Sequence, residues 1–222
     1  MSTVSTPSAV RDRLYLDEVD WRTYTHFLRL FAERPGCRLT YDRGRLEIMS
    51  PLPEHESGVT FLGRLTITLT EELDLPIKEG GSMTLRRRRR QRGLEPDRCY
   101  WIANEPAVRG KRTLDLRIDP PPDLALEVDI TSSSLDRMSI YAALGVPEVW
   151  RLDERTLTFQ TLGTNRKYSA ASHSLSFPLV TPADLMGFLA MCANQDENSV
   201  IRQFRTWIKQ RIAGGGQTST TP

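Results

Sequence analysis

The chain has 222 residues, of which 39% are hydrophobic and 26% are charged, and its formal net charge is +2. The length allows one substantial core, and the composition is that of an ordinary globular domain, which excludes a disordered or a fibrous protein. A net charge this small does not by itself indicate a nucleic-acid partner, so the placement of the basic residues matters more than their total.

Cysteine usage and hydropathy bear on the cellular compartment. The three cysteines, Cys37, Cys99 and Cys192, are odd in number and far apart, which argues against a disulfide framework and against a cysteine-rich zinc site. The N-terminus lacks a charged stretch followed by an apolar one, and no charge-free apolar run approaches about 18 residues. We therefore expect a cytoplasmic protein that is neither secreted nor inserted in a membrane.

The first part of the chain predicts a helix, a hairpin and a second helix. Residues 1–16 are polar and are expected to form a flexible N-terminus. Aromatic and apolar residues then recur at helical spacing from Trp21 to Phe31, until Pro35-Gly36 ends the helix. Alternation on both sides of Asp42-Arg43-Gly44 is typical of a β-hairpin over 37–49. Apolar residues at helical spacing predict the next helix over 54–73.

The middle of the chain predicts short strands over 76–79, 83–88 and 96–103, with Gly80-Gly81 and Gly93 as turns between them. An unbroken basic run, Arg86 to Arg90, begins on the second of these strands. On a strand this run points arginines to both faces. A solvated edge that discourages aggregation and a set of contacts to phosphates both account for it, and the sequence leaves the two interpretations open.

The apolar segment 123–130 predicts a buried strand, and the hydroxyl residues 131–134 then offer N-caps for a helix over 135–144. Gly145 and Pro147 end that helix. Strands are predicted over 148–152 and 156–161, with weaker ones near 167–168 and 175–177. A last helix is predicted over 195–212.

The expected organisation is a flexible N-terminus (1–16), one domain that includes the first helix (17–193), a C-terminal helix (194–213) and a disordered glycine-rich tail (214–222). The apolar sides of the terminal helices predict a homodimer.

Two acidic clusters thirty residues apart are the strongest functional signal. Glu95-Pro96-Asp97 and Glu127-Val128-Asp129 each lie in a predicted strand, and period-2 alternation puts Glu127 and Asp129 on one face. Two carboxylates that share a face near the core repel each other and lose hydration, unless positive charge compensates them. Mg²⁺ and Mn²⁺ are hard cations that take oxygen ligands, so the clusters predict a divalent metal site.

The order of these motifs resembles the Uma-type restriction-endonuclease family, which belongs to the PD-(D/E)xK nuclease superfamily. The resemblance spans most of residues 38 to 190, and its matching stretches are Tyr41 to Pro51, His55, Gly93 to Asp97, Pro121 to Val128 and Ile140 to Trp150. The last stretch is the most specific, because a helix leads there into a strand through Gly-Val-Pro-Glu-x-Trp.

The resemblance implies a fold of the α/β (mixed α+β) class with a restriction-endonuclease-like core, in which helices flank a mixed central sheet. It implies that metal binds where two central strands lie side by side, with Asp97, Glu127 and the main-chain carbonyl of Val128 as ligands. It also places a recurrent histidine on His55 and a recurrent early glutamate on Glu47.

This sequence departs from the superfamily pattern at one position. Asp129 stands two residues after Glu127, where the superfamily has lysine, and Asp129 is a further candidate ligand. Relatives carry the basic residue on the following helix, four residues before a tyrosine, which here is Arg137 before Tyr141. Arginine can stabilise charge on a phosphate but cannot lose a proton to act as a base. Tyr141 and Trp150 are themselves predicted to be core residues.

Three functions follow from these observations. The first is a metal-dependent endonuclease that hydrolyses DNA phosphodiester bonds with Mg²⁺ or Mn²⁺, in which Asp97, Glu127, Arg137, Glu47 and His55 are the catalytic candidates. The second, which the absent lysine favours, is a catalytically inactive nucleic-acid-binding or protein-interaction module on the same fold. The third is a metal-dependent hydrolase of another phosphate ester.

Overall fold

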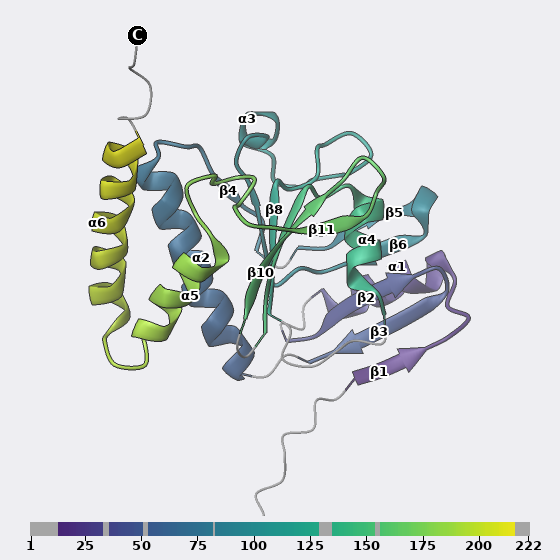
Figure 1. The fold of residues 1–222 in the computed structure, drawn as a ribbon. Coiled ribbons are helices and arrows are strands. Elements are labelled where there is room, and N and C mark those ends of the chain that lie inside the picture. The colour runs from purple at the N-terminus through teal and green to yellow at the C-terminus, as the bar shows by residue number, and fades with distance from the viewer. Residues whose placement is uncertain are drawn as a thin grey trace, which may run out of the picture.

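The computed structural model describes residues 13–32, 36–50, 53–81, 83–128, 135–153 and 156–215, with the backbone alone for 53–57 and 215 (Figure 1). Its helices are α1 (Trp21–Phe31), α2 (Pro53–Glu72), α3 (Glu105–Val108), α4 (Arg137–Leu144), α5 (Pro182–Met191) and α6 (Glu197–Gly215), with a 3₁₀ turn η1 (Arg88–Arg90). Its strands are β1 (Arg13–Leu16), β2 (Arg38–Asp42), β3 (Arg45–Met49), β4 (Lys78–Glu79), β5 (Leu85–Arg87), β6 (Arg92–Leu94), β7 (Arg98–Trp101), β8 (Leu124–Val128), β9 (Glu148–Leu152), β10 (Leu157–Leu162) and β11 (Tyr168–Ala171).

The strands form two sheets. The smaller sheet has the order β1-β3-β2-β6-β5 and is antiparallel throughout. The larger sheet has the order β11-β10-β9-β8-β7-β4, in which β8 and β9 are parallel and the other neighbours are antiparallel. This larger sheet is mixed and flanked by helices, which confirms the predicted fold class.

Helices cover both faces of the larger sheet. On one face, α2 and α5 pack over Leu126, Val128 and Trp150, and α6 packs on the outer side of α2 and α5 (Figure 1). On the other face, α4 and the strands β5 and β6 pack over Ala125. Side chains alternate along a strand, so Glu127 points in the same direction as Ala125, toward α4. Glu127 is therefore the polar end of an apolar face that lies between the two sheets.

Strand β2 separates two environments in the smaller sheet. Leu39 and Tyr41 face α1 and pack against Tyr24. Arg38 and Thr40 alternate with them and face the larger sheet, where their partners are Asp97 and Arg137. One strand thus supplies apolar residues to the core under α1 and polar residues to the acidic cluster.

The predicted hairpin is confirmed, since β2 and β3 pair in register up to Asp42 and Arg45. The two residues between them, Arg43 and Gly44, have φ of 46° and 98°. Positive φ at both positions is the backbone of the two-residue turn that matches the twist of paired strands.

Residues 13–16 were predicted to belong to a flexible N-terminus, and this is wrong, because they form β1. The strand pairs with β3, and Arg13 donates to Glu47 at 3.2 Å. The strand has only four residues, Arg-Leu-Tyr-Leu, and it follows a polar stretch, so its alternation is too short to be recognised in the sequence.

Gly93 was predicted to be a turn, but it lies inside β6. A Cβ at this position would clash with the hydroxyl of Tyr24, so glycine is needed for the close approach of α1. The turn falls instead at Gln91, with φ of 50°. The basic run is divided accordingly: Arg86 and Arg87 end β5, and the remaining three arginines form η1.

The strand predicted near 175–177 is also wrong. The backbone amides of Leu175 and Ser176 donate to the Glu148 carboxylate at 3.0 and 2.9 Å instead of to a neighbouring strand. Helix α5 was not predicted, although its start carries a capping box formed by Thr181 and Asp184.

The apolar side of α6 faces the interior of this chain. Val200, Phe204 and Ile208 are fully buried in the core that α2 and α5 share. These residues therefore do not support the predicted homodimer, which remains a prediction. No helix within the described ranges is both long and apolar enough to span a membrane.

Candidate active site

The two acidic clusters meet at one end of the larger sheet. Arg98 of β7 pairs with Leu126 of β8, so extending this antiparallel register by one residue places Asp97 opposite Glu127. Asp97 Oδ2 accepts a hydrogen bond from the backbone N–H of Val128 at 2.7 Å. Both side chains are buried, with relative exposures of 5% for Asp97 and 8% for Glu127.

Arg137 begins α4 and binds Glu127 through two nitrogens. Its Nε donates to Glu127 Oε2 at 3.1 Å and its Nη2 to Oε1 at 2.6 Å. The same guanidinium donates to Thr40 Oγ1 at 2.6 Å and to the carbonyl of Glu95 at 2.9 Å. The spacing to Tyr141 predicted that Arg137 points to the acidic cluster, and these contacts confirm it.

Arg38 holds the second carboxylate. Its Nη1 lies 2.7 Å from Asp97 Oδ1 and donates to the carbonyl of Pro96 at 2.9 Å. The sequence did not indicate Arg38, because this residue lies on the first strand of a hairpin far from Asp97 in the chain. The alternation of that hairpin was the available signal, since it puts Arg38 and Thr40 on one face.

Tyr141 contributes to the site as well as to the core. Its ring is fully buried in the cluster between the two sheets, as predicted, and its hydroxyl donates to Glu127 Oε1. Residues four apart share one side of a helix, so Arg137 and Tyr141 reach the same carboxylate from α4. Trp150 is a core residue, stacked on Phe159.

Burial and neighbouring charges shift the pKa values of Glu127, Arg137 and Tyr141. Burial raises the pKa of Glu127, the charge of Arg137 opposes this shift, and the charge of Asp97 adds to it. Burial lowers the pKa of Arg137, but the interactions with Glu127, Tyr141 and Asp97 together outweigh it, so the net shift is upward and the guanidinium stays protonated. Burial and the negative charge of Glu127 raise the pKa of Tyr141 well above its usual range, so its hydroxyl remains a donor.

Glu95 supports the site from behind. Its Oε1 accepts from Thr84 Oγ1 at 2.8 Å, and its Oε2 accepts from the backbone N–H of Leu39 at 3.1 Å. Burial raises the pKa of Glu95, and these hydrogen bonds oppose the shift. Glu95 thereby connects β2 and the segment before β5 to its own main-chain carbonyl, which accepts from Arg137.

Of the remaining candidates, Glu47, His55 and Asp129, only Glu47 has a described side chain. Glu47 is buried on β3 directly opposite Thr40, so the two side chains share the face toward the site, and Glu47 pairs with Arg13 at 3.2 Å. His55 lies in the first turn of α2, but its side chain is outside the described part of the chain, as is all of Asp129. Their functional roles remain predictions.

The donor types fit a hard divalent cation, because two carboxylates and a main-chain carbonyl supply oxygen ligands. The described residues nevertheless contain no group of three or more histidine, cysteine, aspartate or glutamate side chains that could hold a metal ion. Both carboxylates are also engaged, Asp97 by Arg38 and Glu127 by Arg137. A cation at this position would therefore have to share these oxygens with the guanidinium groups or displace them.

The family model Uma2, described as "Putative restriction endonuclease", matches residues 24–190. The chain belongs to the Uma2 family. The matched range contains all the residues that meet at this site: Arg38, Thr40, Glu95, Asp97, Glu127, Arg137 and Tyr141. A crystal structure from Anabaena variabilis, described as a "putative nuclease belonging to DUF820", is 16% identical over 67% of this chain and 89% of that chain, with a TM-score of 0.45. No curated protein matches the chain.

Proposed function

We propose that this chain is a cytoplasmic nuclease of the PD-(D/E)xK type, which hydrolyses DNA phosphodiester bonds with Mg²⁺ or Mn²⁺. One observation carries the proposal: the buried carboxylates of Asp97 and Glu127 converge beside the fixed guanidinium of Arg137. Membership of the Uma2 family supports the same reaction class.

Asp97, Glu127 and the carbonyl of Val128 would hold the cation, with Asp129 as a further candidate ligand. A bound Mg²⁺ or Mn²⁺ supplies a water of lowered pKa and stabilises charge on the phosphoryl oxygens. Val128 N–H and Arg38 fix the orientation of the Asp97 carboxylate, and Tyr141 fixes that of Glu127.

Arg137 would stabilise the negative charge that accumulates in the transition state. Thr40 and the Glu95 carbonyl hold its guanidinium, so little reorganisation accompanies the reaction. Because arginine stays protonated, it cannot remove a proton from the attacking water. That proton has to pass to solvent or to another group, for which Glu47 and His55 are the candidates.

Nicking of supercoiled plasmid by the purified chain tests the proposal. We expect slow nicking in Mg²⁺ or Mn²⁺ that a chelator stops. The Asp97→Ala variant is the control for contamination, because nicking that persists in this variant comes from another protein. Activity on a small phosphate ester without plasmid nicking would favour the hydrolase of another phosphate ester.

The engaged carboxylates favour a second candidate, a catalytically inactive binding module. Among the described residues, Arg38 balances the charge of Asp97 and Arg137 balances that of Glu127 without a cation. Such a network can serve the fold alone. Calorimetry with Mn²⁺ separates the candidates: the nuclease binds the ion and loses it in Asp97→Asn, whereas the binding module takes up no ion.

A further inference from the structure

A groove of about 740 Å³ lies at the edge of the smaller sheet, beside β5. Its walls are α1, the segment 83–88 that contains β5, and the segment 113–117. Four arginines line it from these three parts of the chain, Arg29, Arg86, Arg88 and Arg117, and Asp115 is the one acidic residue among its described lining. Its lining therefore carries a formal charge of +3.

The positive charge of the groove is concentrated on three of these arginines. Arg117 forms an ion pair with Asp115, so these two charges cancel. Arg29, Arg86 and Arg88 are exposed, and within the described part of the chain none of them has a carboxylate partner. Arg29 donates to the backbone carbonyl of Thr25 at 3.2 Å. The hydrogen bonds of Arg117 lower the pKa of Asp115 and the charge of Arg86 lowers it further, so Asp115 also offsets part of the charge of Arg86. The groove thus has three exposed guanidinium groups that no ion pair among the described residues neutralises.

The positive charge continues around the edge strand β5. Arg87 points to the opposite face from Arg86, and its Nε is buried without a hydrogen-bond partner in the described structure. Burial lowers the pKa of Arg87, and the nearby charges of Arg166 and Arg90 lower it further. Arginines that gather without acidic partners repel one another, and an anion removes that repulsion.

A solvated edge explains an exposed arginine on β5, but it does not explain why α1 and segment 113–117 add arginines to the same groove. We infer that this groove binds the phosphodiester backbone of a nucleic acid, with Arg29, Arg86 and Arg88 on phosphate oxygens. Guanidinium groups match phosphate geometry through paired hydrogen bonds. The choice of a nucleic acid as the partner rests on the proposed function.

The groove is connected to the acidic cluster through Glu95. Thr84 lines the groove and donates to the Glu95 carboxylate at 2.8 Å. The carbonyl of the same Glu95 accepts from Arg137 at 2.9 Å. A strand held in the groove is therefore expected to lie beside Thr84, which is linked through Glu95 to Arg137.

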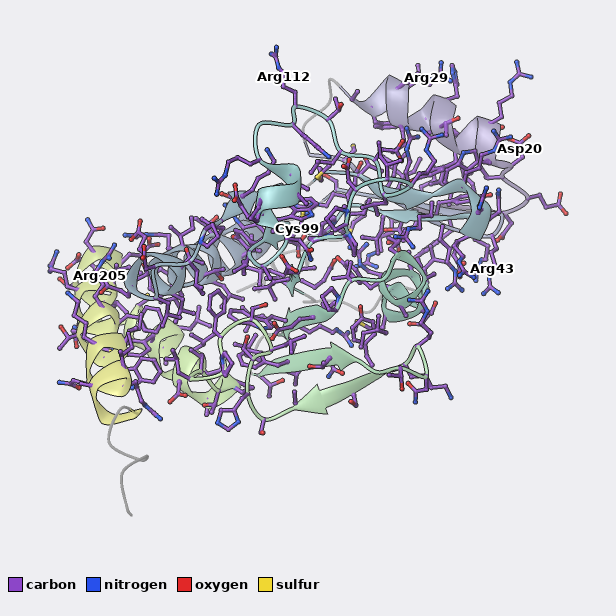
Figure 2. All side chains as sticks on the ribbon, turned by 90° about the horizontal axis from the view of Figure 1, so that it is seen from above. Asp20, Arg29, Arg43, Cys99, Arg112 and Arg205 are labelled. Atoms are coloured by element: carbon purple, nitrogen blue, oxygen red, sulfur yellow. The ribbon has the colours of Figure 1, made fainter. Side chains whose placement is uncertain are left out.

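Binding of a labelled short DNA duplex by the full-length chain, followed by fluorescence anisotropy over a range of salt concentrations, tests the inference. A chelator is present, and a gel verifies that the duplex stays intact, so binding is measured apart from cleavage. The test variant is Arg86→Ala/Arg88→Ala. The matched control is Arg202→Ala/Lys209→Ala, which removes two exposed positive charges from α6. Figure 2 shows Arg29 on α1 and Arg205 on α6 at opposite ends of the molecule.

We expect weaker binding by the test variant and a salt dependence whose slope, log Kd against log salt, is smaller by about two, one for each lost phosphate contact. Arg29→Ala, on the opposite wall, lowers the slope by about one. The control keeps the slope of the unmodified chain. Both arginines of the test variant are exposed, and circular dichroism checks that it is folded. The same measurement with single-stranded DNA and duplex RNA identifies which backbone the groove prefers.

Slopes that are equal in the test variant and the unmodified chain overturn the inference. So does an equal loss of binding in the control. These outcomes are independent of the proposed function: plasmid nicking with unchanged slopes rejects the groove and keeps the nuclease, whereas reduced slopes without nicking reject the nuclease and keep the groove.

Discussion

Two buried glutamates lie on the neighbouring parallel strands β8 and β9, and different kinds of donor hold them. Glu148 is fully buried and accepts from Trp150 Nε1 at 2.8 Å, from the N–H groups of Leu175 and Ser176 at 3.0 and 2.9 Å, and from Ser176 Oγ at 2.7 Å. Every one of these donors is neutral. Glu127 is bound by the charged Arg137 and by the hydroxyl of Tyr141.

The kind of donor distinguishes the structural role of Glu148 from the chemical role that we propose for Glu127. The Glu148 carboxylate takes the place of a strand partner for the amides of Leu175 and Ser176, and it thereby fixes the segment 174–177 to β9. Glu127 lies beside Asp97, and its negative charge is balanced by a guanidinium that two further acceptors hold in place. Both carboxylates are buried, so burial does not distinguish them, and the charge of the partners is the property that sets Glu127 apart from Glu148.

Glu127→Gln is expected to have the largest effect. It removes a negative charge with little change of shape, so we expect loss of Mn²⁺ binding and a fall in plasmid nicking of about 10³-fold. Because Arg137 is left without its partner, the free energy of unfolding should also fall, by about 3 kcal/mol. Nicking within tenfold of the unmodified chain would contradict the assignment of Glu127 to the chemistry.

Glu148→Gln tests the other side of the comparison. Glutamine offers one acceptor atom in place of two, so its NH₂ group would face the N–H and hydroxyl donors of Ser176, which then lose their acceptor. The free energy of unfolding should therefore fall by about 3 kcal/mol. Urea unfolding measures this change. Nicking per folded molecule should stay within about twofold, since Glu148 takes no part in the acidic cluster. Ser176→Ala, which deletes one of the donors, should cost about 1 kcal/mol and serves as the graded control.

Substitution of Arg137 separates charge from geometry. Arg137→Ala should lower the nicking rate by about 10²-fold, the usual effect of removing one group that stabilises charge at a preorganised site. Arg137→Lys restores the residue type of the superfamily and retains the positive charge, so it should keep more activity than Arg137→Ala. Equal rates for the two variants would show that the positive charge at this position does not matter.

Local sequence patterns were sufficient for much of the fold. Helices α1, α2, α4 and α6 carry apolar residues at regular spacing, and the hairpin between β2 and β3 carries its own turn. Two of the errors occurred where a distant partner decides the structure. Tyr24 is the reason that Gly93 lies in a strand, and Glu148 is the reason that residues 175–177 do not form one.

The same distinction applies to the site. Asp97, Glu127 and Arg137 could be predicted because motifs with short spacing surround each of them. Arg38 and Thr40 could not, because they come from the smaller sheet, and a sequence does not show which face of one sheet packs against another. Tyr141 was assigned to the core alone, since nothing in its helical pattern indicates that its hydroxyl reaches a carboxylate.

Glu95 shares features with both Glu148 and Glu127, and its substitution is expected to have the smallest effect. Its carboxylate has neutral donors, as Glu148 does, and Arg38 and Arg137 are near enough to act on its charge. Burial raises its pKa above the value of an unfolded chain, which is about 4.3 for glutamate. A raised pKa means that the folded state binds the proton more tightly, so the stabilising contribution is complete below the unfolded pKa and is lost as pH rises through the folded pKa.

Glu95→Gln removes this titration. Glutamine can accept from the Leu39 N–H and donate to the Thr84 hydroxyl, so the hydrogen bonds of Glu95 are preserved. We expect the free energy of unfolding of the variant to gain on that of the unmodified chain as pH rises from about 4 to neutrality, because only the unmodified chain acquires a buried charge in this range. Urea unfolding at several pH values measures the difference. If the unmodified chain instead gains stability relative to the variant as pH rises, Arg38 and Arg137 outweigh burial. Glu95 would then belong with Glu127 as a charge-paired member of the site.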